Sequence, residues 1–118
     1  MAIALDEPLA TACIVAMKSD PNLMISATTL AEALIVADRA AVGDRMRRLV
    51  GELGFEIVSV SPADSERVAA AYSLWGKGVH PARLNLGDCF AYALAKERRC
   101  SLLFVGDDFS QTDIESVL

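Results

Sequence analysis

The chain is poor in cysteine, in aromatic residues and in positive charge, and each shortage excludes a class of protein. Its cysteines are odd in number and none is in C-x-x-C spacing, so we interpret Cys13, Cys89 and Cys100 as small core residues of a cytoplasmic protein. Aromatic residues make up 6% of the chain and apolar residues 53%, so aliphatic side chains must build the core, and a disordered chain is excluded. No apolar run reaches the roughly 18 residues of a membrane span, and the first residues lack the basic segment of an export signal.

The shortage of positive charge limits the partners of the protein. The 118 residues include 11 lysines and arginines against 16 aspartates and glutamates, a formal net charge of −5. An acidic domain gains no general attraction to a polyanion, so indiscriminate coating of nucleic acid is excluded. A nuclease is not excluded, because an active site built from carboxylates stays negative until divalent cations fill it. The length fits one domain over residues 1–118, which would bury roughly 65% of its extended-chain surface.

Helical and strand patterns alternate along the chain. We expect helices at residues 7–18, 28–41, 44–53, 61–75 and 86–98, and strands at residues 23–26, 55–60 and 101–105. A loop with two glycines and a proline joins the last two helices. The alternation with short connections predicts an α/β fold, in which helices cover a parallel sheet. Such folds usually open with a central apolar strand, whereas this chain opens with a helix.

Acidic residues fall where parallel sheets form sites, at the carboxyl ends of strands and the amino ends of the following helices. Glu32 lies one turn into the helix after the first strand, and Asp88 lies in the first turn of the helix after the glycine-rich loop. Asp107 and Asp108 directly follow the last predicted strand. Converging carboxylates suit a hard cation such as Mg²⁺ or Mn²⁺, which could activate a water and stabilise charge on a phosphate. These four acids are therefore the candidate catalytic and metal-ligating residues.

Each acid also has a purely structural interpretation. Glu32 would close a capping box with Thr29, and Asp88 would do the same with Asn85. The acid pair after the last strand would form a turn. Asp113, three residues after a serine, would be part of a helix cap.

The glycine-rich loop carries three side chains that could contact phosphates. Lys77 and Arg83 are cationic, and His80 is the only histidine of the chain. His80 could contact a phosphate or assist proton transfer. Its structural interpretation is a solvated side chain on a loop.

Three stretches together resemble the PIN-domain ribonucleases of the VapC toxin type. They are ISATTLAEA at 25–33, KGVHPARLNLGDCFAYALA at 77–95 and LLFVGDDFSQTDI at 102–114. The likeness covers nearly the whole chain, and the second and third stretches are the more specific ones, because loop, helix cap, acid and post-strand acid occur in order. The resemblance implies a PIN-like three-layer α/β/α fold with a parallel sheet. It also implies Mg²⁺- or Mn²⁺-dependent cleavage of RNA phosphodiesters, silenced by a VapB-like antitoxin.

The resemblance assigns roles to individual residues. Glu32 matches the family's helix glutamate, Asp88 matches its metal-ligating aspartate, and Asp107 or Asp108 matches the acid after the last strand. Lys77, His80 and Arg83 would then steer RNA phosphates. A homodimer is expected, both on the resemblance and because a small domain so rich in apolar residues has surface to cover. No membrane partner is expected.

One departure from the family pattern leaves two functions open. Family members begin with a strand of the type VIDTSA, whose aspartate is a principal metal ligand, whereas this sequence begins at what looks like the following segment. Asp6 does not replace that aspartate, because it belongs to the acid–proline start of the next helix. Either the natural start lies upstream, or the protein is shortened and its metal site weakened. The chain is then either an endoribonuclease toxin, or a PIN-like binding module that dimerises or docks an antitoxin without efficient cleavage. An unrelated α/β regulatory domain is disfavoured, because no acid pair follows the first strand.

Overall fold

The computed structural model describes residues 15–18, 22–100 and 111–114. The chain divides into two compact units, one running up to Val58 and one from Ser59 to Val117, and each is described by itself. Among the described residues, none of the helices combines the length and the apolar character needed to cross a bilayer.

Some predicted elements lie outside the described residues. They include the strand expected at 101–105 and the acids Asp107 and Asp108, together with most of the first helix. Residues 15–18, at the end of that helix, are helical as predicted.

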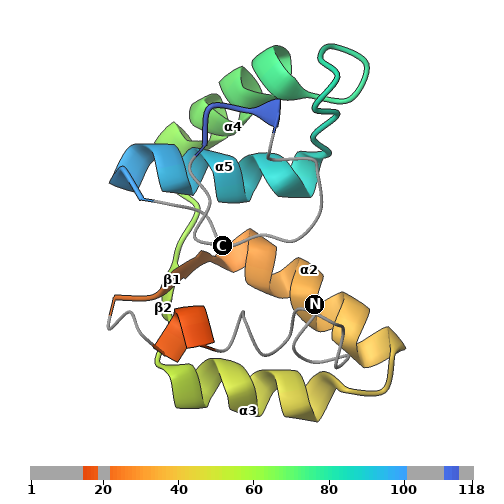
Figure 1. Cartoon of the computed structure of the whole chain (residues 1–118), viewed down its shortest axis with the longest axis vertical. Helices are drawn as coiled ribbons and strands as arrows, with labels where there is room; N and C mark the ends of the chain where they lie inside the picture. The colour runs from red at the N-terminus through yellow and green to blue at the C-terminus, as the bar shows by residue number, and fades with distance from the viewer. Residues whose placement is uncertain (1–14, 19–21, 101–110, 115–118) are drawn as a thin grey trace. The chain divides into compact units, whose positions relative to one another are not determined.

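Among its described residues, beyond the helical residues 15–18, the first unit contains two short strands and two helices (Figure 1). Strand β1 (Met24–Ser26) leads directly into helix α2 (Ala27–Arg39), and helix α3 (Gly43–Leu53) precedes strand β2 (Glu56–Val58). The two strands run parallel and lie next to each other, as expected when a helical connection returns the chain in the same direction. The parallel sheet and the order of elements in this unit are therefore confirmed.

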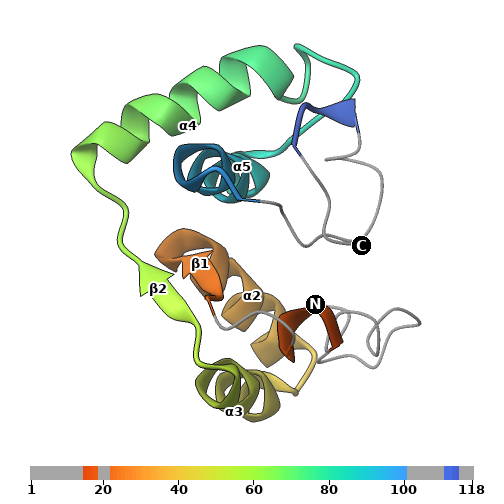
Figure 2. The same ribbon diagram turned by 60° about the vertical axis from the view of Figure 1, so that its left-hand side comes forward.

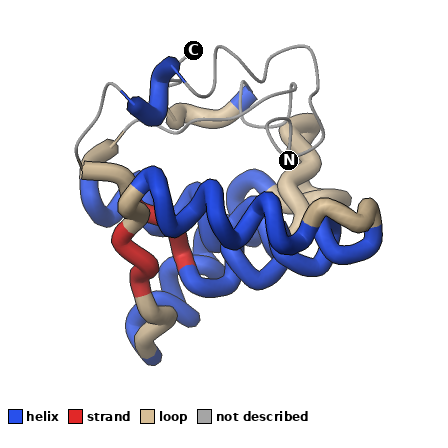
Figure 3. Tube along the Cα trace, turned by 90° about the horizontal axis from the view of Figure 1, so that it is seen from below, coloured by secondary structure: helices blue, strands red, loops and turns tan. Residues whose placement is uncertain are grey.

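The register of the parallel pair places Ile25 opposite Ile57 and Ser26 opposite Val58. The sheet is short, and helices make up most of the described chain (Figure 3).

Helices α2 and α3 of the first unit lie side by side (Figure 2). They pack through small and flexible side chains. Ala37 is fully buried and packs with Met46, and Leu34, Val42 and Val50 surround this pair. These residues recur at intervals of three and four along each helix, which places them on one face. The arginines of α3 (Arg45, Arg47 and Arg48) are exposed on its outer face, as expected for a helix in which apolar and basic residues occupy different positions.

The second unit is built on helix α4 (Pro62–Trp75) and helix α5 (Leu86–Arg98). Both begin with a capping box, and α4 also has Pro62 in its first turn, where the missing N–H is not needed. The predicted bounds of these helices agree with the structure to within one residue.

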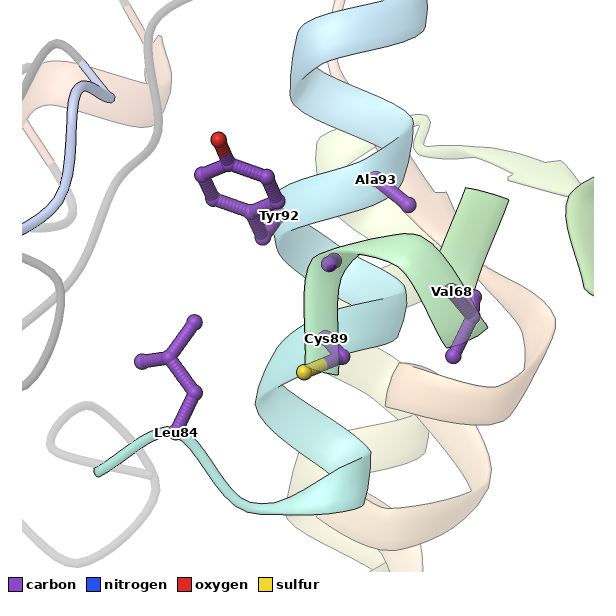
Figure 4. Close-up of a cluster of buried hydrophobic side chains, with 6 residues drawn as sticks. Val68, Leu84, Cys89, Tyr92 and Ala93 are labelled. Atoms are coloured by element: carbon purple, nitrogen blue, oxygen red, sulfur yellow. The ribbon is translucent and has the colours of Figure 1, made fainter. Parts of the chain in front are cut away.

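The core of the second unit lies between α4 and α5. It contains the buried residues Val68, Ala71, Leu84, Cys89, Tyr92 and Ala93. Figure 4 shows this cluster, with the hydroxyl group of Tyr92 directed away from the axis of α5. Leu84 and Cys89 are fully buried, so the end of the loop and the start of α5 are both fixed by packing.

Candidate functional site

Asp88 is held at the start of α5 by reciprocal hydrogen bonds. The backbone N–H of Asp88 donates to Oδ1 of Asn85 at 2.8 Å, and the backbone N–H of Asn85 donates to Oδ2 of Asp88 at 3.0 Å. The capping interpretation of Asp88 is thus confirmed. It is compatible with metal binding, because a carboxylate offers about four lone-pair sites and the capping bond uses one of them. The helix N-terminus also stabilises the negative charge that a metal ligand must carry.

The thiol next to this carboxylate is not a nucleophile. Burial of the side chain, together with the negative charge of Asp88, raises the pKa of Cys89 to about 11. A thiol with this pKa stays protonated near neutral pH, and Cys89 is fully buried. The prediction that Cys89 is a core residue is confirmed, whereas the same prediction is wrong for Cys100, whose side chain is exposed.

Glu32 does not cap its helix, which corrects the structural interpretation of this residue. Helix α2 begins at Ala27 with Ser26 as its N-cap residue, so Glu32 lies in the second turn, beyond the reach of a capping box. Thr29, the expected partner, has a buried Oγ1 without a hydrogen-bond partner in the described part of the chain. Within those residues the exposed carboxylate of Glu32 likewise makes no hydrogen bond or ion pair.

The structure does not test whether the four acids meet. Glu32 belongs to the first unit and Asp88 to the second, and Asp107 and Asp108 lie outside the described residues. In the ranges 15–18, 22–100 and 111–114, no three histidine, cysteine or acidic side chains gather closely enough to hold a metal ion. A site formed by the four acids stays a prediction.

The loop between α4 and α5 is held at both ends by backbone hydrogen bonds. The N–H of Lys77 donates to the carbonyl oxygen of Leu84 at 2.9 Å. The N–H of Leu84 donates to the carbonyl oxygen of Trp75 at 3.0 Å. Leu84 and Ala82 are buried, with exposed fractions of 0% and 1%, so they anchor the loop on the core. The loop is therefore a folded part of the second unit, and not a solvated connection.

His80 has a fixed orientation inside this loop. Its ring meets the ring of Trp75 edge to face, with 4.7 Å between the centroids. Its Nδ1 accepts a hydrogen bond from the backbone N–H of Ala82 at 3.0 Å, so the neutral ring carries its hydrogen on Nε2. The solvated interpretation of His80 is wrong, because the side chain is half-buried and held on two sides. Its Nε2–H is a donor suited to a phosphate oxygen.

The two cationic residues of the loop are exposed, and one of them has an unusual backbone. Arg83 has a φ of 56°, in the left-handed region that residues other than glycine rarely adopt. Such a conformation persists where surrounding contacts impose it, and such residues concentrate at functional sites. Here the N–H of Arg83 donates to the carbonyl oxygen of His80 at 3.0 Å, and both neighbours of Arg83 are buried.

A chain of side-chain hydrogen bonds, which the sequence did not reveal, runs beside this loop. The indole N–H of Trp75 donates to Oη of Tyr92 at 2.9 Å, and the Tyr92 hydroxyl donates to Oδ1 of Asp113 at 2.6 Å. The ammonium group of Lys96 donates to Oδ2 of the same carboxylate at 3.0 Å. We name Trp75, Tyr92, Asp113 and Lys96 the polar chain. The one available signal is the spacing of Tyr92 and Lys96, which places both on one face of α5.

The polar chain changes the proton affinities of its members. The hydrogen bond from Tyr92 and then that from Lys96 lower the pKa of Asp113 below its usual value, so its carboxylate is ionised. Burial, followed by the hydrogen bond to Asp113, raises the pKa of Tyr92 to about 12. Both oxygens of Asp113 are used within the chain, a role that its interpretation as a helix cap did not anticipate.

Comparisons with known proteins agree with the fold. The model of the PIN domain family matches residues 1–115. Ribonuclease VapC42 of Mycobacterium tuberculosis is 43% identical over 104 residues, which cover 84% of this chain and 79% of the relative. Ribonuclease VapC30 of the same organism is 38% identical over 120 aligned positions, covering 99% of this chain and 92% of the relative. Ribonuclease VapC36 is 42% identical over 114 residues, with coverages of 93% and 81%. Nucleases of the family depend on divalent metal ions. The chain therefore belongs to the PIN-domain family, among the VapC-type ribonucleases.

Proposed function

We propose that this protein is a metal-dependent endoribonuclease toxin that cleaves RNA phosphodiesters and is neutralised by a VapB-like antitoxin. One observation carries the proposal besides family membership. A single hydrogen-bonded segment, from Trp75 to Cys89, presents three phosphate-binding side chains and then Asp88. Two cationic side chains that could contact the RNA backbone thus lie on a segment whose backbone is held in place and which leads to a carboxylate that would bind a metal.

The residues available fit a hard divalent cation. Asp88, Glu32 and an acid at 107 or 108 would hold Mg²⁺ or Mn²⁺, since all offer carboxylate oxygens and none a softer donor. The metal would supply an activated water and stabilise the charge that develops on the phosphate. The position of Asp88 in the first turn of α5 places its carboxylate where the helix dipole favours a negative charge.

The loop would bind and orient the RNA. Lys77 and Arg83 would attract phosphates locally in a protein that is negative overall, and Nε2–H of His80 would donate to a phosphate oxygen. Because the loop is anchored by Ala82 and Leu84, these donors need little ordering when RNA binds.

We also propose that the protein acts as a homodimer in the cytoplasm, with no membrane partner. The alternative of a binding module without efficient cleavage is not favoured, because the relatives that cover most of the chain are named ribonucleases.

The test compares two aspartates that occupy the same position in two capping boxes. Asp88→Asn should reduce cleavage of deproteinised total bacterial RNA in the presence of Mn²⁺ to background, because an amide is a poor ligand for a hard cation. Its amide oxygen can still accept the N–H of Asn85, so the fold should survive. Asp64→Asn, the matched control in the capping box of α4, should cleave like wild type.

Cleavage is read as new RNA ends on sequencing gels, and circular dichroism checks the fold of both variants. Undiminished cleavage by Asp88→Asn would refute the proposed site, and equal loss in both variants would attribute the effect to helix capping.

A further inference from the structure

We propose that the polar chain positions His80 for RNA binding, with Tyr92 and Asp113 acting as positioning residues through Trp75. The inference rests on the proposed function, because it gives the orientation of His80 a purpose in binding a phosphate. It assigns a role to a buried tyrosine and an aspartate that nothing in the proposed metal site requires.

The indole of Trp75 is the link between the polar chain and the loop. The indole ring meets the imidazole ring of His80 edge to face, with 4.7 Å between the two ring centroids and 77° between the two ring planes. Its N–H is tied to Tyr92 at 2.9 Å. An indole has two side-chain torsions, so fixing its N–H while its ring is packed leaves one orientation, and that orientation sets the surface on which His80 rests.

The direction of the hydrogen bonds makes the chain a rigid support. The hydroxyl of Tyr92 accepts from Trp75 and donates to Asp113, and each of these partners can fill only that role, because an indole only donates and a carboxylate only accepts. Lys96 fixes the other oxygen of Asp113. Tyr92 is 6% exposed, so its hydroxyl would find few substitutes in water if the carboxylate were removed.

The polar chain also connects distant parts of the sequence. Tyr92 lies 17 residues after Trp75 and 21 residues before Asp113. The segment 111–114 therefore supports, through α5, a loop that lies about thirty residues earlier in the sequence. The loop's own hydrogen bonds hold its backbone, while the polar chain holds the ring against which its histidine packs.

The single histidine makes this positioning directly measurable. The Hε1 proton of His80 gives one unambiguous NMR signal, and the adjacent indole displaces it by its ring current. Tyr92→Phe keeps the aromatic ring but removes the hydroxyl, and Asp113→Ala removes the acceptor. We expect both variants to move the His80 signal toward the position of a free histidine.

Tyr72→Phe is the matched control. It removes another tyrosine hydroxyl of the second unit, whose hydrogen bond to the carbonyl oxygen of Lys77 is long, at 3.4 Å. It should leave the His80 signal in place. The melting temperature of each variant shows whether a changed signal reflects a general loss of stability.

RNA binding supplies the second measurement. A fluorescently labelled pool of mixed-sequence RNA oligonucleotides is titrated with protein that carries Asp88→Asn, so that binding is observed without cleavage. Adding Tyr92→Phe should raise the dissociation constant about three- to tenfold, as expected for loss of one well-placed hydrogen bond to phosphate. Adding Tyr72→Phe should not change it.

Two results would overturn the inference, and they are distinguishable from failure of the proposed function. An unmoved His80 signal in Tyr92→Phe refutes the positioning role, whether or not the protein cleaves RNA. A moved signal with unchanged RNA affinity refutes the link to binding. If His80→Ala also binds RNA like wild type, the error lies in the proposed role of the loop, and not in the polar chain.

Discussion

The protein contains two helix pairs that are joined in different ways. Helices α2 and α3 are linked by three residues, which two hydrogen bonds from Ala41 and Val42 to the end of α2 hold in a tight turn. Helices α4 and α5 are linked by ten residues, 76–85, that pack on the core. The polar chain lies beside this link. Both links are ordered. The second also contains fully buried side chains, those of Ala82 and Leu84, and a side-chain hydrogen bond from the N–H of Ala82 to His80. Binding residues are often carried by loops that a rigid scaffold positions, which supports placing the proposed RNA-binding residues there.

The largest expected effect on stability tests whether the long link is part of the core. Leu84→Ala should reduce the free energy of unfolding by about 3 kcal/mol, because it empties a fully buried site between the loop and α5. Leu86→Ala, two residues further on and 61% exposed, should change it by less than about 0.5 kcal/mol. Urea denaturation measures both. Similar losses in the two variants would show that the loop is not anchored by Leu84.

A smaller effect is expected at high pH and tests the polar chain. A tyrosine in the unfolded chain has a pKa of about 10, whereas burial and Asp113 raise the pKa of Tyr92 to about 12. The folded state thus holds this proton more tightly, so its contribution to stability is complete below pH 10 and is lost as the pH rises through 12. At about 1.36 kcal/mol for each pKa unit, the loss should approach about 2.7 kcal/mol.

Tyr92→Phe should flatten the decline of stability between pH 10 and 12, measured by denaturation at fixed pH values. Ionisation of Cys89 also lowers the stability of the folded state as the pH rises, but at lower pH than Tyr92, since burial raises the pKa of Cys89 to about 11. A variant with the same slope as wild type above pH 11 would contradict the assigned burial of the hydroxyl.

The smallest effect compares Gly76, in the long link, with Gly43, the first residue of α3. A Cβ at Gly76 would lie against the backbone carbonyl of Tyr72 and 2.8 Å from Cδ1 of its ring, neither of which can easily move. Gly76→Ala should therefore destabilise the protein by about 1 to 2 kcal/mol. A Cβ at Gly43 would meet the end of the Asp38 side chain, which can rotate away.

Gly43→Ala should be close to neutral, since alanine favours the helix while the ion pair between Asp38 and Arg47 is disturbed. Differential scanning calorimetry of the two variants checks this order. A more damaging Gly43→Ala would show that the start of α3, and not the long link, is the more tightly constrained.

Local patterns predicted the helices well where the ends carry their own chemistry. Ser61–Pro62 and Asn85–Asp88 mark the starts of α4 and α5, because a side chain three residues away satisfies the free N–H groups. The start of α2 is predicted one residue late. Its N-cap Ser26 is the last residue of β1 and makes no side-chain cap, so no local signal separates the strand from the helix.

The candidate site could be predicted in part. The capping role of Asp88, which the structure confirms, follows from its distance to Asn85. The roles of Glu32 and Asp88 as metal ligands stay predictions. The fixed orientation of His80 could not be predicted, because it depends on the ring of Trp75 from another element.

The amino-acid sequence by itself determined the order of helices and strands, the capping boxes and the family, since each depends on residues that are neighbours along the chain. Only the tertiary structure decided that His80 is held on Trp75 and that Tyr92 joins Trp75 to Asp113. Partners separated by 17 and 21 residues meet only after the helices have packed, and no periodicity in the sequence records which buried hydroxyl will face which carboxylate.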